Sequence, residues 1–237
     1  MSQNDKALTR WEYSKQFSNY HFDPTINEDQ DPHWKYLGRV EGDLAGIFYS
    51  ALEQGKIEPN GFLNRLSVQI GLTEKPFTYE YDKAELEYLN LDPNHTFFDN
   101  LNCKHLEGVQ KIMSAFHCQH AGATFHIQRP GQTFPFHIDE IPGVKNNRHG
   151  SLLDKHPKWG CRFEIPIFDW QPGHVWAVGN TYWKQWKAGD IFWHDWRNTP
   201  HRTANISRCD RVTLQITGLC SGETIEIIEN GGLTIHV

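Results

Sequence analysis

The sequence predicts a mainly β protein in which helices come first and a double-sheet barrel, or jelly roll, follows. Two observations support this fold class. Apolar residues recur at helical spacing in the N-terminal half, and from Thr124 onward the chain changes to short alternating runs broken by proline and glycine. A chain of 237 residues is long enough for one domain of this kind with a full hydrophobic core.

The N-terminal region, residues 1–123, is expected to be a helical and mixed support for the barrel. Residues 1–37 are polar and aromatic with proline breakers, so we expect them to wrap the domain without a core of their own. Apolar residues at helical spacing predict two helices, and shorter mixed runs between them indicate strands. The expected elements are helices at 38–56 and 101–116 and strands at 66–70 and 77–81.

Residues 124–218 are expected to form the β core, followed by a C-terminal extension at 219–237. No repeat, low-complexity segment or linker divides the sequence, which therefore predicts a single domain over 1–237. Alternating apolar and polar residues between turns are typical of short strands. The expected strands are Thr124–Gln128, Gly160–Phe168, His174–Val178, Asp190–His194, Arg211–Thr217 and Thr224–Ile228, with a further strand at Leu233–Val237.

Composition excludes several classes of protein. The net charge is −6 and no basic block is present, so nucleic acid is not an expected partner. No apolar run approaches the roughly 18 residues of a transmembrane helix, and the first residues are polar, unlike a signal peptide. The five cysteines are odd in number and form no CxxC pair, which favours thiols in a reducing compartment. We therefore expect a cytoplasmic protein.

The tripeptide His137-Ile138-Asp139 is the strongest candidate for a metal site. Side chains two apart on a strand point to the same face, so His137 and Asp139 would lie side by side. Two histidines and one carboxylate form the facial triad that holds a non-haem iron(II). Alone this motif is a weak signal. The second histidine is expected to be His201, with His194 as its rival, and Arg211, ten residues after His201, favours His201.

Two of the expected strands carry charged side chains on one face. Arg211, Thr213, Gln215 and Thr217 alternate with apolar residues, and an arginine beside a threonine hydroxyl can bind a carboxylate. The alternative is an ordinary amphipathic strand with a solvated polar face. Arg162 and Glu164 also share a face, as an ion pair or as a second anion site.

Tryptophan is unusually abundant. Seven of the nine tryptophans fall between Trp159 and Trp196. Such large rings most often fill a β core or a subunit contact. The alternative interpretation is an aromatic wall beside a ligand pocket, with Trp176 and Trp193 as its candidates.

Taken together, three segments resemble the iron(II)/2-oxoglutarate-dependent oxygenases, and most closely their aspartyl/asparaginyl β-hydroxylase branch. The resemblance spans about Phe125 to Gly218 and is carried by the combined pattern of these segments. The matching segments are 125–131 with Phe136 and His137, the arginine-bearing run 161–167, and the Gly-acid turn at 187–192 followed by His201 and Arg211.

The resemblance implies a cupin-like double-stranded β-helix and a set of ligand roles. His137 and His201 would bind Fe(II), and Asp139 would complete the triad at a position where animal members of the branch have glycine. Arg211 would hold the distal carboxylate of 2-oxoglutarate, with Thr213 beside it, and Arg162 would lie near the 1-carboxylate end. His126 stands where the branch has a serine that helps to bind the co-substrate, and Glu164 stands where it has a histidine.

The activity that the resemblance implies is hydroxylation of an unactivated C–H bond with 2-oxoglutarate and O2, releasing succinate and CO2. An amino acid, a peptidyl residue or a similar small substrate is expected, in a pocket lined by Gln128, Glu164, Trp176 and Trp193. The segment 140–159 would be a lid over the substrate or a solvated insert. Leu233–Val237 could form a homodimer edge. The alternatives are a cupin-type metal enzyme that does not use 2-oxoglutarate and a non-catalytic jelly-roll ligand-binding module.

Overall fold

A computed structural model describes residues 34–60, 63–68, 106–137, 160–179, 181–196 and 199–237. The leading elements are β1 (Trp34–Glu41), α2 (Leu44–Gln54), β2 (Gly55–Asn60), β3 (Leu63–Val68) and α4 (Glu107–Ala115). The barrel strands are β4 (Gln119–Gln128), β5 (Thr133–His137), β6 (Gly160–Pro166), β7 (His174–Val178), β8 (Thr181–Trp183), β9 (Asp190–His194), β10 (His201–Asn205) and β11 (Arg211–Leu219). The chain closes with α6 (Gly222–Asn230) and β12 (Leu233–His236).

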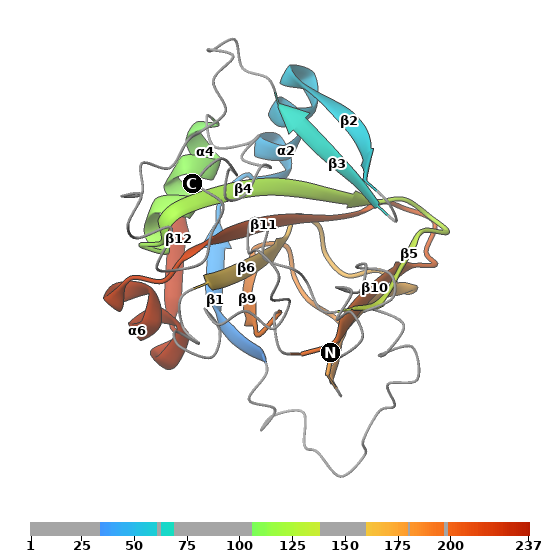
Figure 1. The fold of residues 1–237 in the computed structure, drawn as a ribbon. Coiled ribbons are helices and arrows are strands. Elements are labelled where there is room, and N and C mark those ends of the chain that lie inside the picture. The colour runs from blue at the N-terminus through green and yellow to red at the C-terminus, as the bar shows by residue number, and fades with distance from the viewer. Residues whose placement is uncertain (1–33, 61–62, 69–105, 138–159, 180, 197–198) are drawn as a thin grey trace, which may run out of the picture.

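The strand order confirms the predicted jelly roll. In the eight-stranded sheet, β9-β6-β11-β4 are neighbours, and the four-stranded sheet has the order β5-β10-β7-β8. Successive strands from β4 to β11 are thus interleaved between two sheets, which is the arrangement of a double-stranded β-helix. The large sheet is extended by β1 and β12 beside β9 and by β3 and β2 beside β4, while β5 and β10 belong to the opposite sheet (Figure 1).

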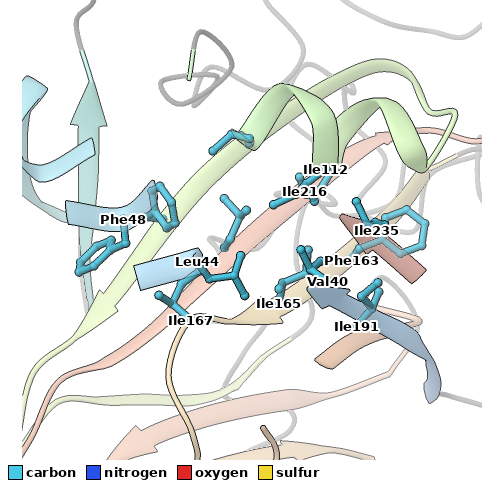
Figure 2. Packing of buried hydrophobic residues seen from close by; sticks show 14 of the residues in the cluster. Val40, Leu44, Phe48, Ile112, Phe163, Ile165, Ile167, Ile191, Ile216 and Ile235 are labelled. Carbon is cyan, nitrogen blue, oxygen red and sulfur yellow. The ribbon is translucent and has the colours of Figure 1, made fainter. Parts of the chain in front are cut away.

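One face of the large sheet packs against α2 and α4 and forms the hydrophobic core. Along β11 the apolar residues point to this face, and β6 and β4 contribute in the same way. Figure 2 shows side chains of β6 such as Phe163 and Ile165 on the same side as Leu44 and Phe48 of α2. Burying each such side chain stabilises the fold by about 1.5–3 kcal/mol. The helices therefore support the barrel from outside, as the sequence predicted.

The other face of the large sheet is polar and looks toward the small sheet. Gln128 Nε2 on β4 donates to Thr203 Oγ1 on β10 at 3.2 Å, which joins the two sheets across the interior. A separate aromatic cluster occupies this interior, in which Trp176 and Trp183 meet edge to face at 3.9 Å between ring centroids. The inside of the barrel is thus not the main apolar core, and charged groups can lie there.

The first predicted helix is shorter than the sequence suggested, because residues 34–41 form β1. Gly38 has φ +138°, and a Cβ at this position would lie 1.9 Å from the Leu233 carbonyl oxygen of β12. This close approach lets β1 pair in parallel with β12. The helix begins only after Asp43, whose Oδ1 accepts from the Gly46 N–H at 2.8 Å as an N-cap.

The strand predicted at Thr224–Ile228 is wrong, since these residues belong to α6. Ser221 caps this helix: its hydroxyl accepts from the Thr224 N–H, and the Thr224 hydroxyl accepts from the Ser221 N–H, each at 3.1 Å. Gly231, with φ +64°, ends it. The β-branched run favoured a strand, but a capped N-terminus and a glycine stop outweigh that preference.

The remaining elements follow the predictions closely. Strands β7 and β9 match their predicted bounds, and the second helix is found at 107–115. β3 overlaps the strand predicted at 66–70, whereas residues 77–81, 101–105 and 140–159 lie outside the described residues. The predicted C-terminal strand is β12, at one edge of the large sheet. Among the described residues, no helix has the length and apolar character needed to cross a membrane.

Candidate active site

Two histidines from separate segments of the sequence meet inside the barrel. His137 is the last residue of β5 and His201 is the first residue of β10, and the two are direct cross-strand partners. Both side chains are buried, and their ring centroids lie 4.3 Å apart. The structure therefore brings together the two histidines that the sequence suggested as metal ligands.

Backbone carbonyls fix the ring orientation of both histidines. His137 Nδ1 lies 2.8 Å from the Pro135 carbonyl oxygen, and His201 Nδ1 lies 3.0 Å from the Thr199 carbonyl oxygen. A carbonyl only accepts, so the tautomer that fits these contacts carries its hydrogen on Nδ1 and has its lone pair on Nε2. A neutral imidazole held in this way, with Nδ1–H on a carbonyl, is the form that ligates a divalent metal. The pair fits an iron(II) site on this observation.

The third predicted ligand, Asp139, lies outside the described residues. Within the ranges that the structure describes, no three His, Cys, Asp or Glu side chains are grouped so that they could hold a metal ion. The role of Asp139 as the carboxylate of the triad stays a prediction.

Arg211 places a buried cation in the barrel interior. It is the first residue of β11, is only 6% exposed, and has its Cζ 5.2 Å from the ring centroid of Trp176 and 5.5 Å from that of Trp186. Burial lowers its pKa to about 10, although Glu164 raises it. Among the described residues its Nε has no hydrogen-bond partner. A buried guanidinium with an uncommitted N–H is suited to binding an anionic ligand.

The side chains that line β11 and β4 next to Arg211 are polar. Thr213 is the next inward residue on β11 and is buried, and its cross-strand partner on β4 is His126. Gln128 faces Arg211 in the register, and its Oε1 has no hydrogen-bond partner in the described part of the chain. All three predicted residues thus share the interior face with Arg211.

Glu164 and Arg162 on β6 extend this polar face. Burial raises the pKa of Glu164 to about 7, while Arg162, the hydrogen bond from Gln215 and the charge of Arg211 lower it. The Gln215 Nε2 donates to Glu164 Oε1 at 2.7 Å. Arg162 Nε donates to Thr217 Oγ1 at 3.1 Å, and its Cζ lies 4.1 Å over the ring of Trp196. The predicted shared face is confirmed, and it is the interior one.

Of the two tryptophans predicted in the pocket, only Trp176 lies inside the barrel. Trp176 is buried and contacts Arg211. Trp193 is a correction, because it points to the opposite face of β9 and packs against the main hydrophobic cluster. The alternation of the strand explains this, since Phe192 and His194 take the inward positions.

His194, the rival of His201 in the sequence, also lies close to the histidine pair. The His194 ring is buried, and its centroid lies 5.0 Å from that of His201. It meets Trp176 and Trp183 edge to face at 6.0 and 6.2 Å. The alternation of the predicted strand at 190–194 was the signal that could have placed His194 inside, whereas nothing in the sequence marked Trp186.

Comparisons with known proteins reach solved structures alone. No protein-family model and no curated protein matches the chain. A prolyl-4-hydroxylase from Pseudomonas putida is 10% identical, covering 88% of this chain and 97% of its own, with a TM-score of 0.45. An RmlC-like cupin from Shewanella frigidimarina is 10% identical, covering 72% of this chain and 89% of its own, with a TM-score of 0.33. A predicted oxalate decarboxylase from Thermotoga maritima is 15% identical, covering 42% of this chain and 66% of its own, with a TM-score of 0.29. At these scores the likenesses carry no argument about function.

Proposed function

We propose that this protein is an iron(II)- and 2-oxoglutarate-dependent dioxygenase that hydroxylates an unactivated C–H bond of an amino acid, a peptidyl residue or a similar small substrate. The observation that carries the proposal is the buried, cross-strand pair of His137 and His201 in the same interior as the buried Arg211. A histidine pair that could bind a metal and a buried cation that could bind an anion would together meet the two needs of a keto acid co-substrate.

The chain's own side chains would divide the work as follows. His137 and His201 would bind the iron through Nε2, with Asp139 as the proposed carboxylate. Arg211 would bind the distal carboxylate of 2-oxoglutarate, with Thr213 as a hydroxyl donor beside it. Iron(II) bound there would, with 2-oxoglutarate and O2, supply the oxidising power for C–H hydroxylation, with release of succinate and CO2.

Other interior residues would shape the pocket. Trp176 lies over Arg211 and would exclude water from the co-substrate. Gln128 and Glu164 present polar groups to the same interior, and His126 lies beside Thr213 across the strands. Arg162 is the proposed contact for the opposite end of the co-substrate. Its packing on Trp196 would hold its guanidinium in place.

The test is formation of succinate from 2-oxoglutarate with iron(II) and O2, together with binding of iron and of 2-oxoglutarate measured separately. We expect His137→Ala to lose iron binding and turnover. Arg211→Ala should keep iron binding but lower the affinity for 2-oxoglutarate on the order of 10-fold to 100-fold, because a charge-assisted pair is lost.

Matched controls separate a local effect from a general one. His236→Ala removes an exposed histidine at the sheet edge, and Arg208→Ala removes an exposed arginine in the turn before β11, so both should behave as the unaltered protein. Iron binding with no effect of 2-oxoglutarate would favour a cupin-type enzyme of another kind. Failure to bind either ligand would refute the proposal and favour a non-catalytic binding module.

A further inference from the structure

Three cysteines that the proposed function does not use meet at the far end of the large sheet. Cys118 precedes β4, Cys161 lies in β6, and Cys220 follows β11, the strand between the other two. The register aligns these positions, since Cys161 pairs with Gly218. The cluster lies on the helix side of the sheet, packed in the main hydrophobic core, at the opposite end of β11 from Arg211.

Two of these sulfur atoms are close enough to be joined by a disulfide bond. The Cys118 and Cys161 Sγ atoms lie 3.2 Å apart. A disulfide has its sulfurs about 2.05 Å apart, so a shift of roughly 1 Å would join them. Cys118 also lies near α6, because the Thr224 hydroxyl is 3.9 Å from its Sγ and donates to the Phe116 carbonyl at 2.9 Å. Cys118 thus lies between the end of α4 and the start of α6.

The two thiols differ in their access to solvent. Cys161 is fully buried, and burial raises the pKa of its thiol well above the ordinary value, with the hydrogen-bonding contacts to Cys118 and Cys220 acting in the same direction. Cys118 is only partly buried. A soluble oxidant therefore reacts with Cys118 first, and Cys161 lies next to Cys118 on its buried side.

We propose that Cys118 and Cys161 are a modification site that hydroperoxides oxidise to an intramolecular disulfide. The Cys118 sulfur attacks one peroxide oxygen, the O–O bond breaks, Cys118 becomes a sulfenic acid, and one water (or alcohol) is released. The Cys161 sulfur then attacks the Cys118 sulfur, the S–O bond breaks, and a second water forms with the thiol proton. Two thiols have lost two electrons and the peroxide has gained them.

The expected consequence is a more stable fold with no new contact at the proposed active site. The link would close a loop between positions separated by 43 residues in sequence, which restricts the unfolded chain. For a chain of this size, we expect the melting temperature to rise on the order of 10 °C.

The experiment uses the full chain with Cys103→Ser and Cys209→Ser, which leaves only the three clustered cysteines. The reduced protein is treated with one equivalent of hydrogen peroxide, quenched with an alkylating agent, and analysed by intact mass and peptide mapping. We expect a loss of two hydrogens, one cross-linked peptide pair containing Cys118 and Cys161, and a raised melting temperature that dithiothreitol reverses.

Single variants show which sulfurs are needed. Cys220→Ser should still form the link, whereas Cys118→Ser should not. Cys161→Ala should not form the link either. If that buried variant fails to fold, Cys220→Ser, Cys118→Ser and the peptide map together test which cysteines form the link. A link that contains Cys220, a link between two chains, or addition of oxygen without any link would overturn the proposal.

Discussion

Replacing Glu164 by glutamine should change how the stability of this protein depends on pH. Burial raises the pKa of this carboxyl from 4.5 to about 7, against the opposing influence of Arg162, Gln215 and Arg211. The folded state therefore holds the proton more tightly than the unfolded chain. The contribution of the Glu164 carboxyl to stability is fully present below about pH 4.5 and is lost as the pH rises through about 7. At about 1.4 kcal/mol for each pH unit, the loss is about 3 kcal/mol.

The Glu164→Gln variant lacks this titration but keeps an oxygen that can accept the hydrogen bond from Gln215. Its free energy of unfolding relative to the unaltered protein should therefore increase by about 3 kcal/mol between pH 4.5 and 8. Urea unfolding in the presence of a chelator measures this at each pH. Glu107→Gln, which alters an exposed glutamate on α4, is the control and should change little. Parallel curves for Glu164→Gln and the unaltered protein would refute the reasoning.

Three further predictions test the faces and the ends of the elements. Under the proposed function, Trp176→Leu should raise the KM for 2-oxoglutarate several-fold. Trp193→Leu, on the helix side, should lower stability and leave that KM unchanged. Equal effects on KM would contradict the two placements. Ser221→Ala should lower the free energy of unfolding by about 1 kcal/mol in urea, and an unchanged value would argue against the cap. Gly38→Ala should cost about 1–3 kcal/mol and speed hydrogen exchange in β12, because its Cβ would meet a backbone carbonyl there; unaltered exchange would count against it.

The sequence carried enough information for the parts of the fold that alternate cleanly. In β11 each second residue is polar, so the shared face of Arg211 and Thr213 followed from the pleat alone. The turn before β9 was marked by glycine and an aspartate, and Gly189 has φ +87° there. Local geometry of this kind is fixed by residues that lie next to one another, which is why it could be predicted.

The errors have a common physical origin in information that the local sequence lacks. In β9 both faces carry aromatic residues, so alternation alone could not tell that Phe192 points into the barrel and Trp193 toward the helices. Pairing of β1 with β12 and with β9 joins segments that lie far apart in the sequence, and these long-range contacts explain why Gly38 lies in a strand. The meeting of His137 with His201 was expected from the His-x-Asp motif and the spacing to Arg211, while Asp139 stays a prediction.

The two faces of β11 place two kinds of constraint on alternate residues of one strand. Substitution of Val212, Leu214 or Ile216 changes the packing with the helices, and substitution of Arg211 or Thr213 changes the interior that a ligand would meet. A scan of every residue in this strand should therefore separate into two interleaved sets, one limiting the amount of folded protein and the other its ligand affinity. Selection for a new specificity could proceed on the second set while the first keeps the barrel intact.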